Sequence, residues 1–402
     1  MKICMLAYSF YESDMRILRY AKTLVESGHV VDVISLRRED APDFEVLGGV
    51  NVYRIQTRQR NERHWFDYLI RVARFMAVSA FVLSRKHFSK SYDVIHVHSV
   101  PDFLVFAALL AKASGAKVIL DIHDILPEFF ASKFGACEQS LKFKALLLAE
   151  RVSVRFSDHV IIANDLWYER LIKRSANPDR CTAMVNYPDC EIFHPRERPK
   201  LRNEKFRITY PGTLNVHQGL DVAIHAVAKI KDEMPDLEFH IYGEGPAKTA
   251  LIDLSTHLGL SDIVIFHEFI SCDRIAEVMA LSDLAVVPKR ASSAFGNEAM
   301  STKIMEFMSL GVPVIVSRTK VDSYYHDDSR IRFFESDNSL DLANAITILR
   351  RNKELRQSLV ANASAYARNN NWQEKKLLYL QLVEGLGSRT RRTPKSVRSV
   401  TN

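Results

Sequence analysis

Short runs of aliphatic and β-branched residues alternate with segments of helical periodicity along most of this chain. This alternation is typical of strand–helix–strand units and parallel sheets, and it predicts an α/β fold of two doubly wound domains. The predicted strands of the first half are Lys2–Ala7, Val30–Ser35, Val50–Ile55, Asp93–Val97, Val118–Ile122 and His159–Ala163. Those of the second half are Arg207–Tyr210, Glu238–Tyr242, Ile263–Phe266, Leu284–Val287, Val312–Val316 and Arg330–Phe334.

Two helices of the first half have clear patterns. Asp14 can cap the first, apolar residues from Ile17 to Val25 form one face, and Gly28 ends it. A longer amphipathic helix is predicted from Trp65 to Lys86. Its wide apolar face favours packing against a sheet, and contact with a membrane surface is the alternative.

The periodicity is lost between residues 186 and 207, where prolines stand among charged residues, which is typical of an interdomain linker. Ligands of doubly wound sheets bind beyond the carboxyl ends of the strands, so we expect the site in a cleft between the domains. The predicted organisation is an N-terminal Rossmann-like domain over 1–195, a linker over 196–206, a C-terminal Rossmann-like domain over 207–371, a helix crossing back over 372–387, and a basic disordered tail over 388–402.

The composition is that of a globular enzyme, with 402 residues of which 47% are hydrophobic and 26% charged. No apolar run approaches the roughly 18 residues of a membrane span, and the start of the chain lacks signal-peptide features. We therefore expect a cytoplasmic protein. The five scattered cysteines, without a Cys-x-x-Cys pair, are expected to be reduced thiols.

The net charge of +7 is concentrated in two segments. Residues 58–90 hold eight Lys or Arg against two acids, and residues 388–402 hold five without an acid. Such basic zones can bind anionic lipid headgroups or nucleic acid. For the C-terminal zone, a solvated disordered end without a partner is an equally good interpretation. We predict an optional contact with an anionic membrane surface and no nucleic-acid partner.

The most informative segment is Glu298-Ala-Met-Ser-Thr-Lys-Ile-Met-Glu306. The amides of Ser301 and Thr302 stand at the start of a predicted helix, where the helix dipole favours an anion, and Lys303 adds a full positive charge. One turn further along the helix, Glu306 can accept hydrogen bonds from hydroxyl groups. The arrangement suits a ligand in which a sugar, a diphosphate and a ribose follow one another.

This segment, followed by Gly311-Val-Pro313, resembles the Glu-x7-Glu motif of family-4 retaining glycosyltransferases, which have the GT-B fold of two Rossmann-like domains facing an interdomain cleft. The resemblance implies that Glu298 contacts the donor sugar and that Glu306 binds the ribose. It also implies that the amides of residues 301 and 302 hold the diphosphate.

The activity that the resemblance implies is transfer of a hexose, with retention, from a UDP- or GDP-sugar to a glycan or lipid-linked acceptor. Bacterial surface polysaccharide synthesis is the expected role, and no metal or other cofactor is expected.

Two loops of the second half resemble the glycine turns of the same family, one at Gly212-Thr213 and one at Gly243-Glu-Gly245. Thr213 and Gln218 stand where the family has a basic pair, so the cation that faces the diphosphate must come from elsewhere. The candidates are Lys303, Lys289 and Arg290, and we expect Lys303 to carry most of the role because a helix fixes its backbone.

In the first half, Asp121-Ile-His123-Asp124 follows a predicted buried strand. A histidine at the end of a strand can accept a proton from an acceptor hydroxyl, and the resemblance places a functional His or acid at this turn. His123 is the predicted residue and Asp124 its rival.

His96 and His98 end another strand with both rings on one face. His98 is expected on the acceptor side, and a zinc site with Asp124 is the alternative. We predict no metal, because no cysteine or third histidine stands at ligand spacing. The Asp14-Met15-Arg16 start of the first helix resembles an Asp-x-Arg subgroup of the family and is expected to shape the acceptor site.

Two other functions share these motifs: a sugar-nucleotide epimerase on the same fold, and a non-catalytic nucleotide-sugar-binding partner of another transferase. A nicotinamide dehydrogenase is disfavoured, because no Gly-x-Gly-x-x-Gly follows a predicted strand.

Overall fold

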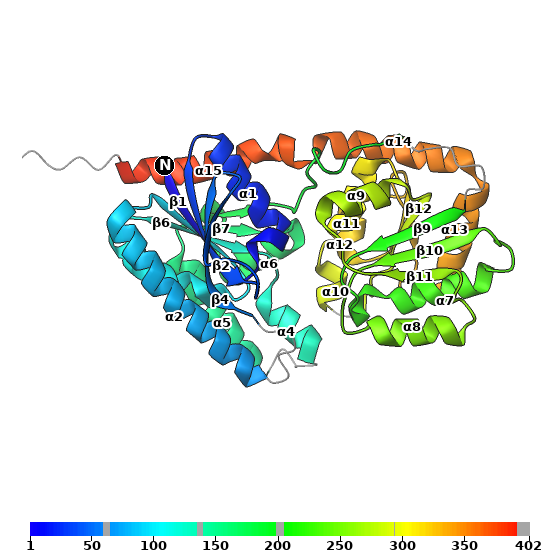
Figure 1. Cartoon of the computed structure of the whole chain (residues 1–402), viewed down its shortest axis with the longest axis horizontal. Coiled ribbons are helices and arrows are strands. Elements are labelled where there is room, and N and C mark those ends of the chain that lie inside the picture. The colour runs from blue at the N-terminus through cyan, green and yellow to red at the C-terminus, as the bar shows by residue number, and fades with distance from the viewer. Residues whose placement is uncertain (59–64, 135–139, 198–204, 293, 392–402) are drawn as a thin grey trace, which may run out of the picture. The chain divides into compact units, whose positions relative to one another are not determined.

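The structure is a computed structural model that describes residues 1–58, 65–134, 140–197, 205–292 and 294–391. The chain forms two compact units, residues 1–186 with the chain from 376 onward, and residues 187–375 (Figure 1). The first boundary falls earlier than the predicted residue 195, because Phe193 is buried in the core of the second unit. Most of the predicted linker lies outside the described residues.

The N-terminal unit is built on an eight-stranded sheet in the order β3-β4-β2-β1-β5-β6-β7-β8. All neighbours are parallel except the pair of β3 and β4. The central strand β1 is buried from its second residue onward, as a parallel sheet covered on both faces requires. The strands are β1 (Lys2–Ala7), β2 (Val30–Arg37), β3 (Phe44–Leu47), β4 (Val50–Thr57), β5 (Val94–His98), β6 (Lys117–Ile122), β7 (His159–Ile162) and β8 (Cys181–Ala183).

Helices cover both faces of this sheet. On one face α2 and α5 pack on the 3-10 helix η2 (Asp102–Ala108), and on the other α1 lies with the later part of α15, where Tyr20 and Tyr379 stack at 4.1 Å (Figure 1). Helix α15 continues past the predicted end at 387, so the first residues of the predicted tail are helical. The helices are α1 (Met15–Glu26), α2 (Trp65–Lys90), α3 (Leu109–Ala113), α4 (Leu126–Phe134), α5 (Leu141–Phe156), α6 (Asp165–Arg174) and α15 (Trp372–Arg391).

The second unit has a six-stranded, entirely parallel sheet in the order β11-β10-β9-β12-β13-β14. One core cluster lies between the sheet and helices α7 and α13, and another lies beneath α9, α11 and α14. Its strands are β9 (Phe206–Pro211), β10 (Leu237–Tyr242), β11 (Val264–His267), β12 (Leu284–Val287), β13 (Val314–Ser317) and β14 (Arg332–Phe334). Its helices are α7 (Leu220–Ile230), α8 (Lys248–His257), α9 (Cys272–Ala280), α10 (Ala294–Glu298), α11 (Thr302–Leu310), α12 (Lys320–Tyr325), α13 (Ser339–Arg351) and α14 (Lys353–Asn369).

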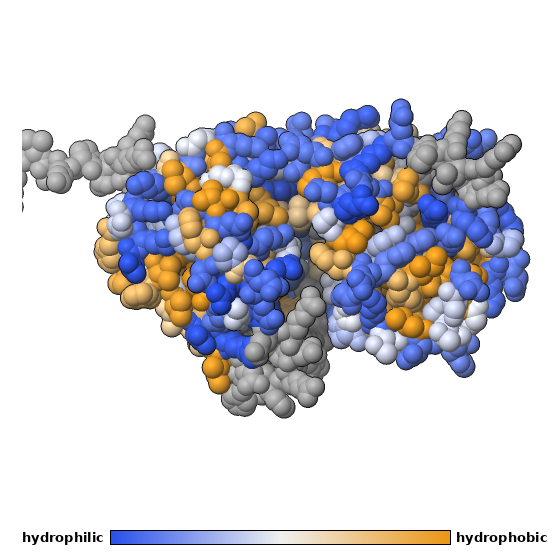
Figure 2. All heavy atoms as spheres, in the orientation of Figure 1, coloured by the Kyte–Doolittle hydropathy of each residue, from blue (hydrophilic) through white to orange (hydrophobic). Residues whose placement is uncertain are grey.

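Helix α2 packs one face against the sheet unit, as predicted, and leaves large apolar residues exposed on the other. Val72, Phe75 and Leu83 are fully buried against the unit, whereas Phe81 and Phe88 are 67% and 68% exposed. Figure 2 shows apolar atoms interspersed with hydrophilic ones along the edge of the unit where α2 lies. None of the helices in the described part of the chain is long and apolar enough to cross a membrane.

Candidate active site

The carboxyl ends of β5 and β6 bring the predicted histidines together. His98 ends β5 and is paired in register with Asp121 of β6, and His123 follows directly after β6. His123 Nε2 lies 3.1 Å from Asp121 Oδ2, and His98 Nδ1 lies 3.3 Å from the same oxygen. The alternation of a strand places Asp121 and His123 on one side, so the acid that contacts His123 is Asp121.

Asp121 is held by a buried arginine from helix α1. Arg16 Nε donates to Oδ2 at 2.9 Å and Nη2 donates to Oδ1 at 2.6 Å, and both side chains are buried. Burial alone raises the pKa of the Asp121 carboxyl, but the Arg16 guanidinium and His123 outweigh burial and hold that pKa well below its usual value. Asp121 is therefore ionised near pH 7.

The structure changes the interpretation of the first helix. Asp14 caps α1 by accepting from the amide of Ile17 at 3.3 Å, and it also accepts from the Ser9 hydroxyl at 3.1 Å. The side chain of Arg16 is buried against Asp121. Both residues predicted for the acceptor side thus have structural partners, and Arg16 acts on the site through Asp121.

Burial lowers the pKa of His98, and it lowers the pKa of His96 well below the usual value, so both rings are neutral near pH 7. His96 Nδ1 lies 3.0 Å from the hydroxyl of Tyr379. Burial also raises the pKa of Asp124, the rival of His123.

His96, His98 and Asp121 offer ligand atoms within 4.8 Å of one another, so the metal alternative involves Asp121 where the sequence indicated Asp124. A cation here would compete with Arg16, which already donates to both carboxylate oxygens. The donor set therefore favours a charged hydrogen-bond network, and independence of metal stays a prediction.

In the second unit, two glycine loops meet at the carboxyl ends of β9 and β10. The amide of Gly212 donates to the carbonyl of Tyr242 at 2.8 Å, and the amide of Leu214 donates to that of Glu244 at 3.0 Å. Gly243 has φ +143°, and a Cβ on it would lie 2.0 Å from the carbonyl oxygen of Gly212. Only glycine permits this approach. Gly245 closes the same loop, and Thr213 is exposed beside it.

Lys303 lies across the first of these loops from the first turn of α11. A Cβ on Gly212 would lie 2.3 Å from Lys303 Cε, and Lys303 Nζ is 5.3 Å from the centroid of the Tyr210 ring. Burial lowers the pKa of Lys303 to about 8, against the opposing effect of Glu306. Within the described residues, the Lys303 ammonium has no hydrogen-bond or ion-pair partner.

The start of α11 carries further polar groups. Ser301 is the N-cap residue, its side chain makes no capping bond, and its buried hydroxyl finds no partner in the described part of the chain. Thr302 is the first helical residue and Glu306 is half-buried one turn later. Such a helix start attracts an anion.

The other candidate cations serve the protein itself. Lys289 Nζ is buried, donates to the carbonyl of Ala299 at 2.6 Å and lies 3.0 Å from Asp322 Oδ2. Arg290 forms ion pairs with two aspartates, Asp221 and Asp337. Glu298 is buried, and one of its oxygens accepts from Lys320 Nζ at 2.9 Å.

Two parallel Rossmann-type units, each with polar groups at the carboxyl edge of its sheet, define the GT-B class of glycosyltransferases. Residues 14–186 match the family model described as "Glycosyl transferase 4-like domain", and residues 193–366 match "Glycosyl transferases group 1". The chain belongs to this family of glycosyltransferases.

Known proteins extend the comparison over the whole chain. An uncharacterized glycosyltransferase of Methanocaldococcus jannaschii is 27% identical over 312 residues, 74% of either chain. Sucrose-phosphate synthase from Thermosynechococcus elongatus has a TM-score of 0.78 at 17% identity, over 97% of this chain and 100% of that chain. Anabaena HepE, in complex with UDP-glucose, has a TM-score of 0.67 at 17% identity, over 98% of this chain and 99% of that one. At these identities the two structures show the fold alone.

Proposed function

We propose that this glycosyltransferase transfers a hexose, with retention, from a UDP- or GDP-sugar to a glycan or lipid-linked acceptor. The observation that carries the proposal is the Lys303 ammonium, which lies without an ion-pair partner in the described residues at the start of α11 and beside the loop of Gly212. Negative charge develops on the leaving diphosphate as the sugar departs. A fixed cation and helix amides aimed at that charge stabilise the transition state.

The rest of the donor fits the neighbouring residues. Glu306 accepts hydrogen bonds from the ribose hydroxyls, and the Ser301 hydroxyl and the first amides of α11 contact the phosphates. Glu298, which also accepts from Lys320, contacts the sugar. The complex of the similar HepE protein with UDP-glucose supports a nucleotide-sugar donor.

The acceptor is activated in the N-terminal unit. Since Asp121 is ionised, His123 donates to it through Nε2–H, which fixes the tautomer and leaves Nδ1 to accept a hydrogen bond. An acceptor hydroxyl bound at Nδ1 becomes a better nucleophile as its proton moves toward the ring. In a retaining reaction this hydroxyl attacks from the face that the diphosphate leaves.

The proposed role is bacterial surface polysaccharide synthesis at the inner face of the membrane. The exposed apolar residues of α2, which include Phe81 and Phe88, lie among its basic residues and support a peripheral contact with lipid.

The proposal is tested by thermal shift with UDP, GDP and their sugars, followed by turnover of the ligand that binds, with and without chelator. We expect one nucleotide to raise the melting midpoint, because it binds only the folded state. Turnover that requires an acceptor and persists in chelator supports a metal-independent transferase. Conversion of the donor sugar without an acceptor would indicate the epimerase, and binding without turnover would indicate the non-catalytic partner.

A further inference from the structure

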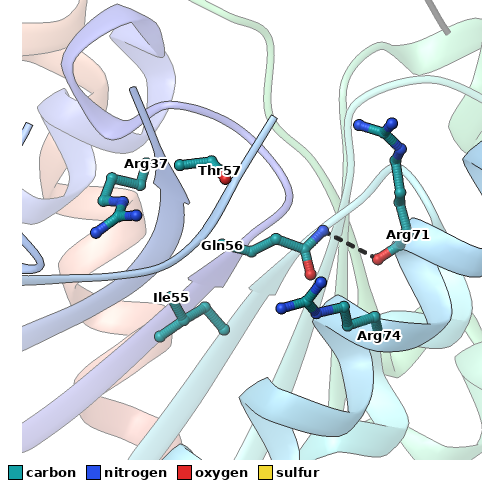
Figure 3. A pocket seen from close by; sticks show the side chains of 6 residues that line it. All are labelled: Arg37, Ile55, Gln56, Thr57, Arg71 and Arg74. Atoms are coloured by element: carbon teal, nitrogen blue, oxygen red, sulfur yellow. Dashed lines mark hydrogen bonds between the residues drawn. The ribbon is translucent and has the colours of Figure 1, made fainter. Parts of the chain in front are cut away.

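A basic cavity lies in the N-terminal unit, away from His123 but at the same edge of the sheet. Its volume is about 340 Å³, within the range of small-molecule sites, which are roughly 300–1,000 Å³. Arg37 and Thr57 end the parallel strands β2 and β4 and are paired in register, so the cavity opens at the carboxyl ends of the strands. The side chains that line it are Arg37, Ile55, Gln56, Thr57, Arg71 and Arg74 (Figure 3).

Three arginines and no acid line this cavity among the residues that the structure describes. Arg37 forms an ion pair with Asp43, outside the lining, and Arg74 has neither an ion pair nor a hydrogen bond with any described residue. Arg74 is exposed and points toward the side-chain amide of Gln56 (Figure 3). Guanidinium groups carry only donors, so they require an acceptor-rich anion.

Gln56 offers the cavity a hydrogen-bond acceptor, whereas the arginines offer only donors. Its Nε2 donates to the carbonyl of Arg71 at 3.1 Å, which fixes the amide (Figure 3). Its Oε1 is buried and has no partner in the described residues. A ligand that satisfies the whole lining therefore presents anionic oxygens to the arginines and a hydroxyl to Gln56.

The geometry points to a binding site for the phosphate group of a phosphorylated sugar or polyol, with a hydroxyl of the same molecule donating to Gln56 Oε1. The ligand is taken here as the acceptor of the transferred sugar, and in this respect the assignment rests on the proposed function. In the sheet, β2 and β4 stand two and three strands from β5, roughly 10–15 Å at the usual strand spacing. The phosphate is therefore a remote handle that places the acceptor and takes no part in the transfer.

Calorimetric titration at low ionic strength tests the site with glycerol 3-phosphate, inorganic phosphate and glycerol. We expect glycerol 3-phosphate to bind more tightly than inorganic phosphate, and glycerol not to bind. Arg74→Gln should weaken glycerol 3-phosphate by roughly tenfold, the scale of a lost charged hydrogen bond, and Arg74→Lys should recover part of the affinity. The matched control is Arg151→Gln, an exposed arginine on α5 that does not line the cavity.

Vesicles of phosphatidic acid and of phosphatidylcholine identify the source of the phosphate. Arg74-dependent binding to phosphatidic acid vesicles alone would assign the phosphate to a lipid headgroup, and binding of the soluble ester would assign it to a free acceptor. Equal affinities of wild type, Arg74→Gln and Arg151→Gln for every phosphate, or no binding at all, would overturn the site. UDP binding is measured on the same samples. Loss of UDP binding would contradict the donor site, and loss of phosphate binding alone would contradict the cavity site.

Discussion

Lys303 is buried where its charge is unfavourable for folding. Replacing it with an uncharged residue should therefore raise the free energy of unfolding and weaken donor binding. Burial lowers its pKa from 10.5 to about 8, so the folded protein disfavours the ammonium form. Methionine has a similar length and no charge. We expect Lys303→Met to fold into a more stable protein that binds the donor nucleotide poorly.

The size of the stability gain follows from the pKa. The difference between 10.5 and about 8 corresponds to ~3 kcal/mol, at about 1.4 kcal/mol for each pH unit. Because Lys303 is still partly exposed, solvent screening reduces this to about 1–2 kcal/mol. The unfavourable contribution is complete below pH 8, where both states hold the proton. Between pH 8 and 10.5 the unfolded state binds more protons, so the stability of the wild type rises toward that of Lys303→Met.

Donor binding should show the opposite dependence on pH. Near pH 7 about nine-tenths of Lys303 is protonated, and near pH 9 about one-tenth, whereas the phosphates of UDP are mostly ionised at pH 7 and fully ionised at pH 9. The affinity for UDP, or for GDP if GDP binds, should therefore fall by up to about tenfold over this range, and Lys303→Arg should abolish the dependence. Urea denaturation and calorimetric titration measure the two effects. A Lys303→Met protein that is less stable than wild type and binds the nucleotide normally would refute the reasoning.

Three other substitutions test the remaining assignments. His123→Ala should lower kcat with unchanged nucleotide affinity, because it acts on the chemical step, and normal turnover would move the role to Asp124. Glu306→Ala should weaken nucleotide binding by roughly 1–3 kcal/mol, and an unchanged affinity in titration would remove the ribose assignment. Arg16→Met leaves the Asp121 carboxylate buried without its guanidinium and should lower the free energy of unfolding at pH 7 by about 3–5 kcal/mol. Without Arg16, burial raises the pKa of Asp121 in the folded variant, so this carboxylate takes up a proton at a higher pH than in the folded wild type. The deficit should therefore shrink as pH falls, and a constant deficit in urea denaturation would argue against the ion pair.

The twelve strands predicted from apolar runs are all present, and each has at least one parallel neighbour in its sheet. The two strands that were not predicted differ in kind. β3 is a half-exposed antiparallel edge strand, and β8 has three residues, so neither forms a long apolar run. Helix α11 begins where the sequence predicts, and Gly311 at φ 73° follows its last turn.

The acceptor side was harder to predict than the donor side. The residues proposed for the phosphates lie close together in the sequence, around Lys303. Asp121 and Arg16 are 105 residues apart, and no periodicity joins an arginine of the first helix to the end of β6. The role of His123 stays a prediction, and the acid that contacts it, Asp121, stands before it in the strand and not after it.

The cations of the second unit show why charge in the sequence is a poor guide to phosphate binding. Lys289 and Arg290 follow a strand and are suitably placed in the chain, yet each is bound to aspartates of the same unit. Removal of Lys289 would take away the charge partner of the buried Asp322 and would lower activity through the fold. Loss of turnover in those variants therefore cannot distinguish a donor contact from a structural one. Nucleotide affinity at unchanged stability can make that distinction, and we expect it to fall for Lys303→Met and not for variants of Lys289 or Arg290.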